Sequence, residues 1–133
     1  MRRLLPLVAL VAVVAACGQQ SAKPFLAAPT AKCLRDQGFR ASTNDAEVSL
    51  VFATAANGGL RAVPKGGGNT LEIGFASDGA DAANLEKAIR RVADPKLRPH
   101  LRDVMSSKRN AVLLWTVSPT PEQQQTVLGC LRT

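Results

Sequence analysis

Tyrosine is absent from the chain, and histidine and tryptophan occur once each, as His100 and Trp115. A single histidine, with no Cys-x-x-Cys pair, excludes the common zinc-site patterns. The Gly-x-Ser-x-Gly and Ser-x-x-Lys patterns of serine nucleophiles are also missing. The glycines at 66–68 are not followed by Lys and Ser or Thr, so they do not form a phosphate-binding P-loop motif. We therefore expect no catalytic, metal-ligating or cofactor-binding residues.

A long apolar run is missing too. Spanning a bilayer takes about 20 apolar residues, and the run from Leu4 to Val14 is about half that length. The run follows a basic start at positions 1–3 and ends in Val-Ala-Ala before Cys17. A basic start, a short apolar run and small residues are typical of an export signal. One alternative is a plain secretory signal, which would leave Cys17 as an ordinary thiol.

The Val-Ala-Ala-Cys ending resembles the lipobox of bacterial lipoprotein precursors, in which the cysteine is acylated and the signal is removed. The resemblance covers residues 1–17 alone. It implies that Cys17 carries lipid, with palmitate among its acyl chains, and anchors the protein at the extracytoplasmic face of the cell membrane. The expected organisation is a removed signal peptide at 1–16, a lipidated cysteine and tether at 17–29, and a single globular domain at 30–133.

Cys33 and Cys130 remain once Cys17 is assigned to lipid. An even pair of cysteines in an oxidising compartment predicts a disulfide. Closing a loop of nearly 100 residues stabilises a fold by about 4 to 5 kcal/mol in the chain-entropy model. The alternative is a pair of buried, reduced thiols that pack as small apolar side chains.

Positive charge is concentrated in one stretch of the sequence. Without Arg2 and Arg3 the chain has a net charge of +5, and the segment 86–110 alone carries the same excess. Anionic lipid headgroups or other envelope polyanions are therefore candidate partners, while a solvated basic surface without a partner is the alternative. Nucleic acid is not expected, because no aromatic residues are interleaved with the cations. The candidate contact residues are Lys87, Arg90, Arg91, Lys96, Arg98, Arg102, Lys108 and Arg109.

Alternation of apolar and polar residues predicts most of the strands. In 70–76 the alternation places Glu72 on a solvent face, and the Asn-Gly-Gly sequence at 57–59 indicates a hairpin. The continuous apolar run around Trp115 predicts a buried central strand. The predicted strands cover 39–42, 48–55, 60–63, 70–76, residues near 104–107 within an otherwise loop-like 96–110, and 111–117.

Capping residues and apolar stripes predict three helices. Thr30 caps a short helix at 31–37 that Gly38 ends, and Asp78 or Asp81 caps a helix at 81–93. Thr120, Pro121 and Gln123 form the pattern of a capping box for the last helix. In the helix at 81–93 we expect an apolar stripe formed by Ala82, Leu85, Ile89 and Val92. On the solvent side of this helix we expect an ion pair between Glu86 and Arg90.

These elements predict an α+β fold, with a mostly antiparallel sheet of three to five strands and two main helices packed on one face. The expected function is that of a small, lipid-anchored, non-enzymatic envelope protein, a structural or interaction module. The alternative is a solute- or polyanion-binding lipoprotein that uses the basic 86–110 segment or a pocket on the sheet face.

Overall fold

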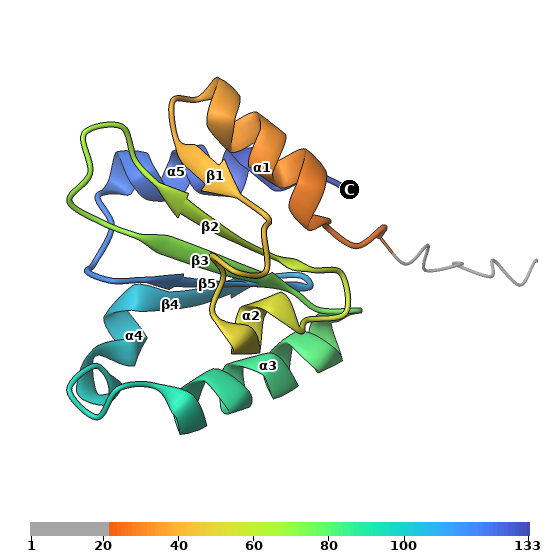
Figure 1. Ribbon diagram of the computed structural model, residues 1–133. Coiled ribbons are helices and arrows are strands. Elements are labelled where there is room, and N and C mark those ends of the chain that lie inside the picture. Colours follow the sequence, from red (N-terminus) through yellow and green to blue (C-terminus); the bar gives the residue numbers. More distant parts are fainter. Residues whose placement is uncertain (1–21) are drawn as a thin grey trace, which may run out of the picture.

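The computed structural model describes residues 22–133, so the predicted signal peptide and Cys17 lie outside the described residues. Within that range the chain forms five α-helices, five strands and one 3-10 turn (Figure 1). In chain order these are α1 (Ala27–Asp36), β1 (Arg40–Ser42), α2 (Leu50–Ala53), β2 (Gly59–Val63), β3 (Leu71–Phe75), α3 (Gly79–Val92), η1 (Arg98–His100), α4 (Leu101–Val104), β4 (Met105–Lys108), β5 (Ala111–Trp115) and α5 (Pro121–Cys130).

The strands form one sheet in the order β1-β2-β3-β5-β4, and every neighbouring pair is antiparallel. The predicted α+β class is confirmed, and five strands fall within the predicted number. As expected from its continuous apolar run, β5 is an interior strand, with β3 and β4 on its two sides. The loop at 65–69 joins β2 to β3, and its three consecutive glycines all have positive φ, a conformation that side chains disfavour.

The sheet carries helices on both faces, which corrects the prediction that the two main helices share one. Figure 1 shows α1 and α5 on one side and α2 and α3 on the other. Along β3, Ile73 and Phe75 point into the larger core with Val127 of α5, whereas Gly74 faces α2 and α3. Along β5, Val112 points into the smaller core with Ile89 of α3. Strand β5 is apolar on both faces, so each of its faces has to be covered.

The strand predicted at 48–55 is wrong, because these residues form the short helix α2 and the turns around it. Val48 and Phe52 are buried at a spacing of four, which is helical, while Leu50, expected on the same face of a strand, is 77% exposed. A short apolar run fits either element, and here tertiary packing decides. The Asn-Gly-Gly turn at 57–59 consequently leads from α2 into β2 and does not form a hairpin.

The folded domain begins earlier than residue 30. Phe25 is buried, and its backbone N–H donates to Oδ1 of Asn110 at 2.8 Å, while Nδ2 of Asn110 donates back to the Phe25 carbonyl at 2.9 Å. Helix α1 starts at Ala27, so Thr30 lies inside the helix and does not cap it. Both cores consist of residues between Phe25 and Leu131, so this part of the chain contains a complete folding unit.

The segment at 96–110 is more ordered than the loop we predicted. Pro99 lies within the turn η1, where a missing N–H costs little, and α4 follows directly. Strand β4 begins at Met105, one residue later than expected. On α3 the apolar stripe ends early, since Val92 is 67% exposed, and the expected ion pair is replaced by a hydrogen bond from Ser107 Oγ to Glu86.

The helix caps follow the predicted chemistry more closely. Asp78 caps α3 by accepting from the Asp81 N–H at 2.8 Å. The capping box of α5 is complete, with Thr120 and Gln123 each accepting from the other's backbone N–H. Among residues 22–133, no helix has the length and apolar character needed to cross a membrane.

A substitution at Gly59 tests how closely α2 packs on the sheet. A Cβ at Gly59 would lie 2.5 Å from the carbonyl oxygen of Phe52, a backbone atom that cannot rotate away. We expect Gly59→Ala to lower the free energy of unfolding by about 1–3 kcal/mol through overpacking. Gly129→Ala is the matched control, because a Cβ there meets nothing within 4 Å, and it should raise stability by about 0.5–1 kcal/mol. Urea denaturation of both variants measures the two changes, and equal effects would contradict this account.

Candidate functional site

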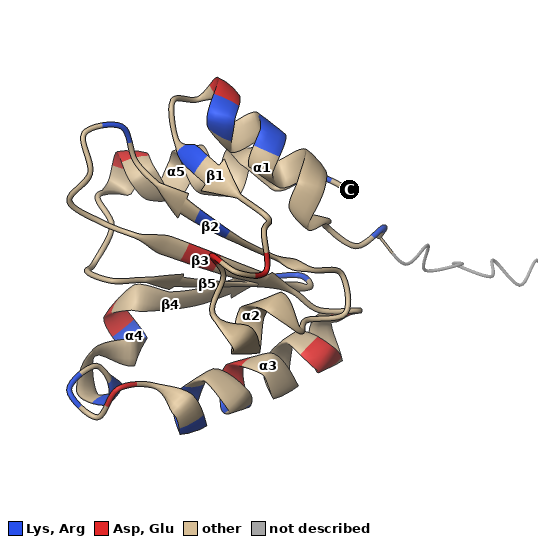
Figure 2. Cartoon of the chain, in the orientation of Figure 1, with Lys and Arg blue, Asp and Glu red and all other residues tan. Residues whose placement is uncertain are grey.

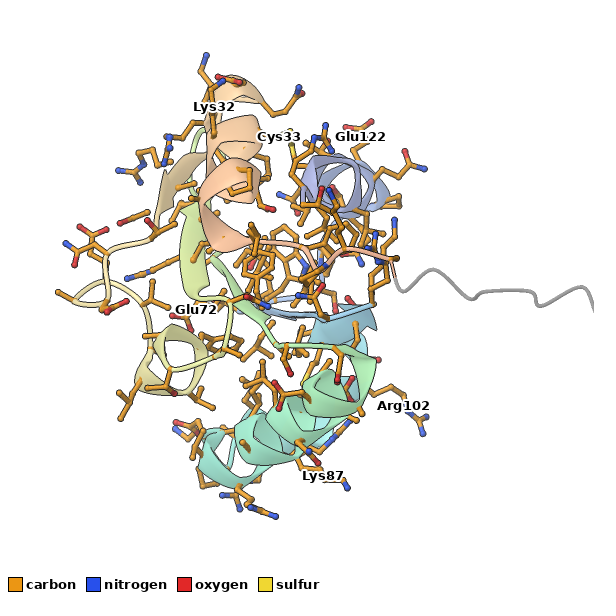
Figure 3. The ribbon with its side chains drawn as sticks, turned by 90° about the vertical axis from the view of Figure 1, so that its right-hand side faces the viewer. Lys32, Cys33, Glu72, Lys87, Arg102 and Glu122 are labelled. Atoms are coloured by element: carbon orange, nitrogen blue, oxygen red, sulfur yellow. A yellow bond between two sulfur atoms is a disulfide. The ribbon has the colours of Figure 1, made fainter. Side chains whose placement is uncertain are left out.

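The predicted disulfide between Cys33 and Cys130 is confirmed. It joins α1 to the end of α5 across 97 residues of sequence, with the two Cα atoms 5.4 Å apart (Figure 3). Hydrogen bonds hold the same two segments together: the Leu26 N–H donates to the Arg132 carbonyl at 2.8 Å, and the Arg132 N–H donates to Thr30 Oγ1 at 3.1 Å. The bridge and these bonds close the α1–α5 layer over the larger core.

The eight cations of the basic segment are all exposed, and four successive elements and loops carry them. In Figure 2 they are spread along α3, the loop after it and α4, with further positive charge at the β4–β5 turn. Two of them have structural contacts. Arg98 donates to the carbonyls of Ala93 and Arg91 at the end of α3, and Arg109 lies 4.2 Å from the ring centre of Phe25. Some cations of this segment therefore stabilise the fold locally.

His100 and Asp81 lie in separate elements. His100 is exposed in η1. A hydrogen bond from the Ser77 N–H, and a second from its hydroxyl, lowers the pKa of Asp81, which lies in the first turn of α3. Within the described residues 22–133, no cluster of three or more His, Cys, Asp or Glu side chains could hold a metal ion.

A groove lies at the β1 edge of the sheet, where it borders the half of one sheet face that α2 and α3 leave uncovered. It encloses about 630 Å³ beside β1 and β2. The register pairs Arg40 with Val63 and Ser42 with Arg61, so these four side chains share the face on which α2 and α3 lie. α3 packs over β5, and α2 over β3 and the start of β2, so the far ends of β1 and β2 have no helix above them. The groove is lined by Arg35, Phe39, Arg40, Ala41, Ser42, Glu47, Arg61 and Val63.

Glu72 belongs to the same row of the sheet, and its position corrects the prediction that it only marks a solvent face. It lies directly opposite Arg61 in the β2–β3 register. Its two carboxylate oxygens accept from the backbone N–H and the hydroxyl of Ser49, at 2.7 and 2.8 Å. No ion pair to Arg61 forms within 4 Å among the described residues. Figure 3 shows Glu72 beside the loop that leads into α2.

A second hollow of about 430 Å³ lies beside β3 and β5. Thr70, Glu72 and Leu114 form its floor, and Asp94 and Lys96 from the loop after α3 form one wall. Trp115 also borders this hollow, but it is 1% exposed and its Nε1 donates to Gln124 at 3.2 Å. Trp115 is thus a core residue, as its place in the apolar run predicted.

Sequence analysis missed the three arginines of the groove, Arg35, Arg40 and Arg61. A weak signal was present, since Arg-Ala-Ser at 40–42 and Arg-Ala-Val at 61–63 both alternate a small apolar residue with longer side chains. In the structure Ala41 and Ala62 turn toward the larger core, which directs both arginines to the opposite face. The count of charges along the sequence pointed to 86–110 and gave no indication that Arg40 and Arg61 lie side by side on neighbouring strands.

Removing the disulfide tests how strongly the α1–α5 layer depends on it. We expect the double variant Cys33→Ala with Cys130→Ala to lose about 4 kcal/mol of stability, because its unfolded chain regains the entropy of a ring of nearly 100 residues. Denaturation of the oxidised wild type and of the variant measures the difference. The reduced wild type is the control and should match the variant. A variant as stable as the oxidised protein would contradict the assigned role.

Comparisons of the chain with protein-family models, with curated proteins and with solved structures find no significant match.

Proposed function

We propose that this chain is a small lipid-anchored protein of the bacterial cell envelope that acts as a non-enzymatic binding module. The disulfide between Cys33 and Cys130 carries the proposal, because such bonds persist in oxidising compartments outside the cytoplasm. The remaining cysteine, Cys17, directly follows Val-Ala-Ala, where a lipobox has its acylated residue.

The start of the folded domain supports attachment close to the membrane. Asn110 and Arg109 hold the segment around Phe25 at the β4–β5 turn, so the domain is entered from that edge of the sheet. Seven residues separate Cys17 from Phe25. Seven residues can span at most roughly 25 Å. A lipid on Cys17 would therefore keep the domain within a few nanometres of the headgroups.

Binding is favoured over catalysis by the lining of the groove. Arginine stays protonated and holds carboxylates or phosphates through paired N–H donors, so Arg35, Arg40 and Arg61 recognise anions without exchanging protons. The same observation favours the second candidate function, in which the protein binds a solute at a pocket on the sheet face. Contact between the cations of 86–110 and anionic headgroups remains a further proposal for the exposed surface of α3.

Labelling with palmitate tests the anchor. We expect the wild-type chain, expressed in a bacterium, to incorporate labelled palmitate, to lose residues 1–16 and to fractionate with membranes. Cys17→Ala should incorporate none, because the acylated sulfur is gone. The double variant of Cys33 and Cys130 is the matched control and should be labelled like wild type. A full-length, unlabelled wild-type product inside the cell would refute the anchor.

A further inference from the structure

We infer that the groove beside β1 and β2 binds a small amphipathic anion, with Arg40 and Arg61 holding its carboxylate or phosphate group. This inference deepens the proposed function by naming the class of ligand. The inference rests on the proposed function in one respect, that the protein acts by binding and not by catalysis. Four observations carry it: the charge of the groove, the hydrogen bonds of Glu72 to Ser49, the hydrogen bond that holds Arg35, and the apolar part of the lining.

Arg40 and Arg61 are diagonal neighbours on adjacent strands, because Arg40 pairs with Val63 and Arg61 lies two residues before it. Diagonal neighbours on one face have Cβ atoms about 7 Å apart, so both guanidinium groups can reach one anion. Like charges this close on a sheet destabilise it unless something opposes them. Glu47 is the one carboxylate among the lining residues and faces three arginines, which leaves the groove with a net charge of +2.

The carboxylate opposite Arg61 in the sheet, that of Glu72, is hydrogen-bonded to another residue. Glu72 is directly opposite Arg61, and such a pair of opposite charges would ordinarily interact across the strands. Instead both oxygens of Glu72 accept hydrogen bonds from Ser49 at the start of α2. The loop before α2 thus holds the carboxylate in place, and the Arg61 guanidinium is left to face the groove with its donors available.

Arg35 is positioned by the edge strand. Its Nη1 donates to the carbonyl oxygen of Ala41 at 2.9 Å, which holds the guanidinium beside β1. A guanidinium has five N–H donors, so this contact leaves others for a ligand. Part of the remaining lining is apolar: Val63 is half-buried on the same face as Arg40 and Arg61, whereas Phe39 is 8% exposed and packs mainly into the larger core. An anionic group on the arginines would therefore place an attached hydrocarbon portion against Val63 and the small part of Phe39 that remains exposed.

The size and location of the groove favour a small soluble ligand. A volume of about 630 Å³ is typical of sites for small molecules. The groove lies at the β1 edge, whereas the start of the described chain is held at the β4–β5 turn near the opposite edge. Four strand spacings separate β1 from β4, roughly 19 Å. In Figure 3 the described chain begins on the side opposite β1 and β2, so the groove faces away from the expected anchor.

Octyl phosphate and octanoate, both below their micelle concentrations, are the probes. Octanol and octylammonium are the matched neutral and cationic controls, and inorganic phosphate tests the anionic group alone. The chain from Gly18 to Thr133, with its disulfide formed, contains the complete folding unit and is titrated with each probe by calorimetry and NMR. We expect the two octyl anions to bind with sub-millimolar to millimolar Kd, at least tenfold more tightly than octanol or phosphate. Backbone shifts should centre on β1 and β2.

Three variants test the arginines. Arg61→Gln and Arg40→Gln should each weaken octyl phosphate about tenfold, and Arg90→Gln on α3, an equally exposed arginine outside the groove, should not. The thermal midpoint without ligand should stay the same or rise in the two groove variants, because each removes a like-charge neighbour. A purely structural arginine would lower it. If a variant does not fold, the NMR shifts of the wild type decide.

Several results would overturn the inference. These are equal binding of octanol and octyl phosphate, equal affinities of the Arg61 and Arg90 variants, or shifts confined to residues 86–110. Binding only to vesicles of anionic phospholipid, lost on substitution of Lys87 and Arg90, would assign the anion site to the α3 surface. Each of these outcomes can occur while palmitate labelling succeeds, in which case the groove is wrong and the envelope anchor stands.

Discussion

The covalent closure of α1 onto α5 is the constraint on which the rest of the fold depends. A domain of this size buries too little surface to be more than marginally stable. Its larger core lies between the sheet and a layer made from two helices at opposite ends of the folded chain. Without the Cys33–Cys130 link, that layer would rest on hydrogen bonds such as those of Arg132 and on apolar packing alone. With one face closed in this way, the other can remain partly open.

The groove beside β1 and β2 exists because α2 and α3 cover only part of their face of the sheet. The helix α3 is long enough to span one half of its face, while α2 has only four residues and reaches no further than β3 and the start of β2. Gly59 and Gly74 lie opposite each other and let α2 approach the sheet closely, which brings Ser49 to Glu72. Close packing at one place and exposure at the next are thus two results of the same short helix.

Local chemistry explains which features sequence reasoning could predict. The alternation of β3, the capping box of α5 and the pairing of two cysteines each depend on neighbouring residues or on simple counting. The strand predicted at 48–55 was wrong because a short apolar run is compatible with a strand as well as with a helix. The helix forms here because it buries Phe52 in the smaller core, a contact between distant segments that the local sequence does not show. The groove needs Arg40, Arg61 and Glu72 in register across three strands, a relation set by hairpin and loop geometry that composition does not encode.

The 97-residue separation of the bridged cysteines has a consequence for how an exported chain matures. When a polypeptide is threaded through a membrane from its N-terminus, Cys33 emerges early, and its partner arrives only after all five strands. If the chain is exported as proposed, correct oxidation would report that translocation of the sheet is complete. Until then Cys33 would have no native partner, and a thiol–disulfide oxidoreductase of that compartment would be able to hold it as a mixed disulfide.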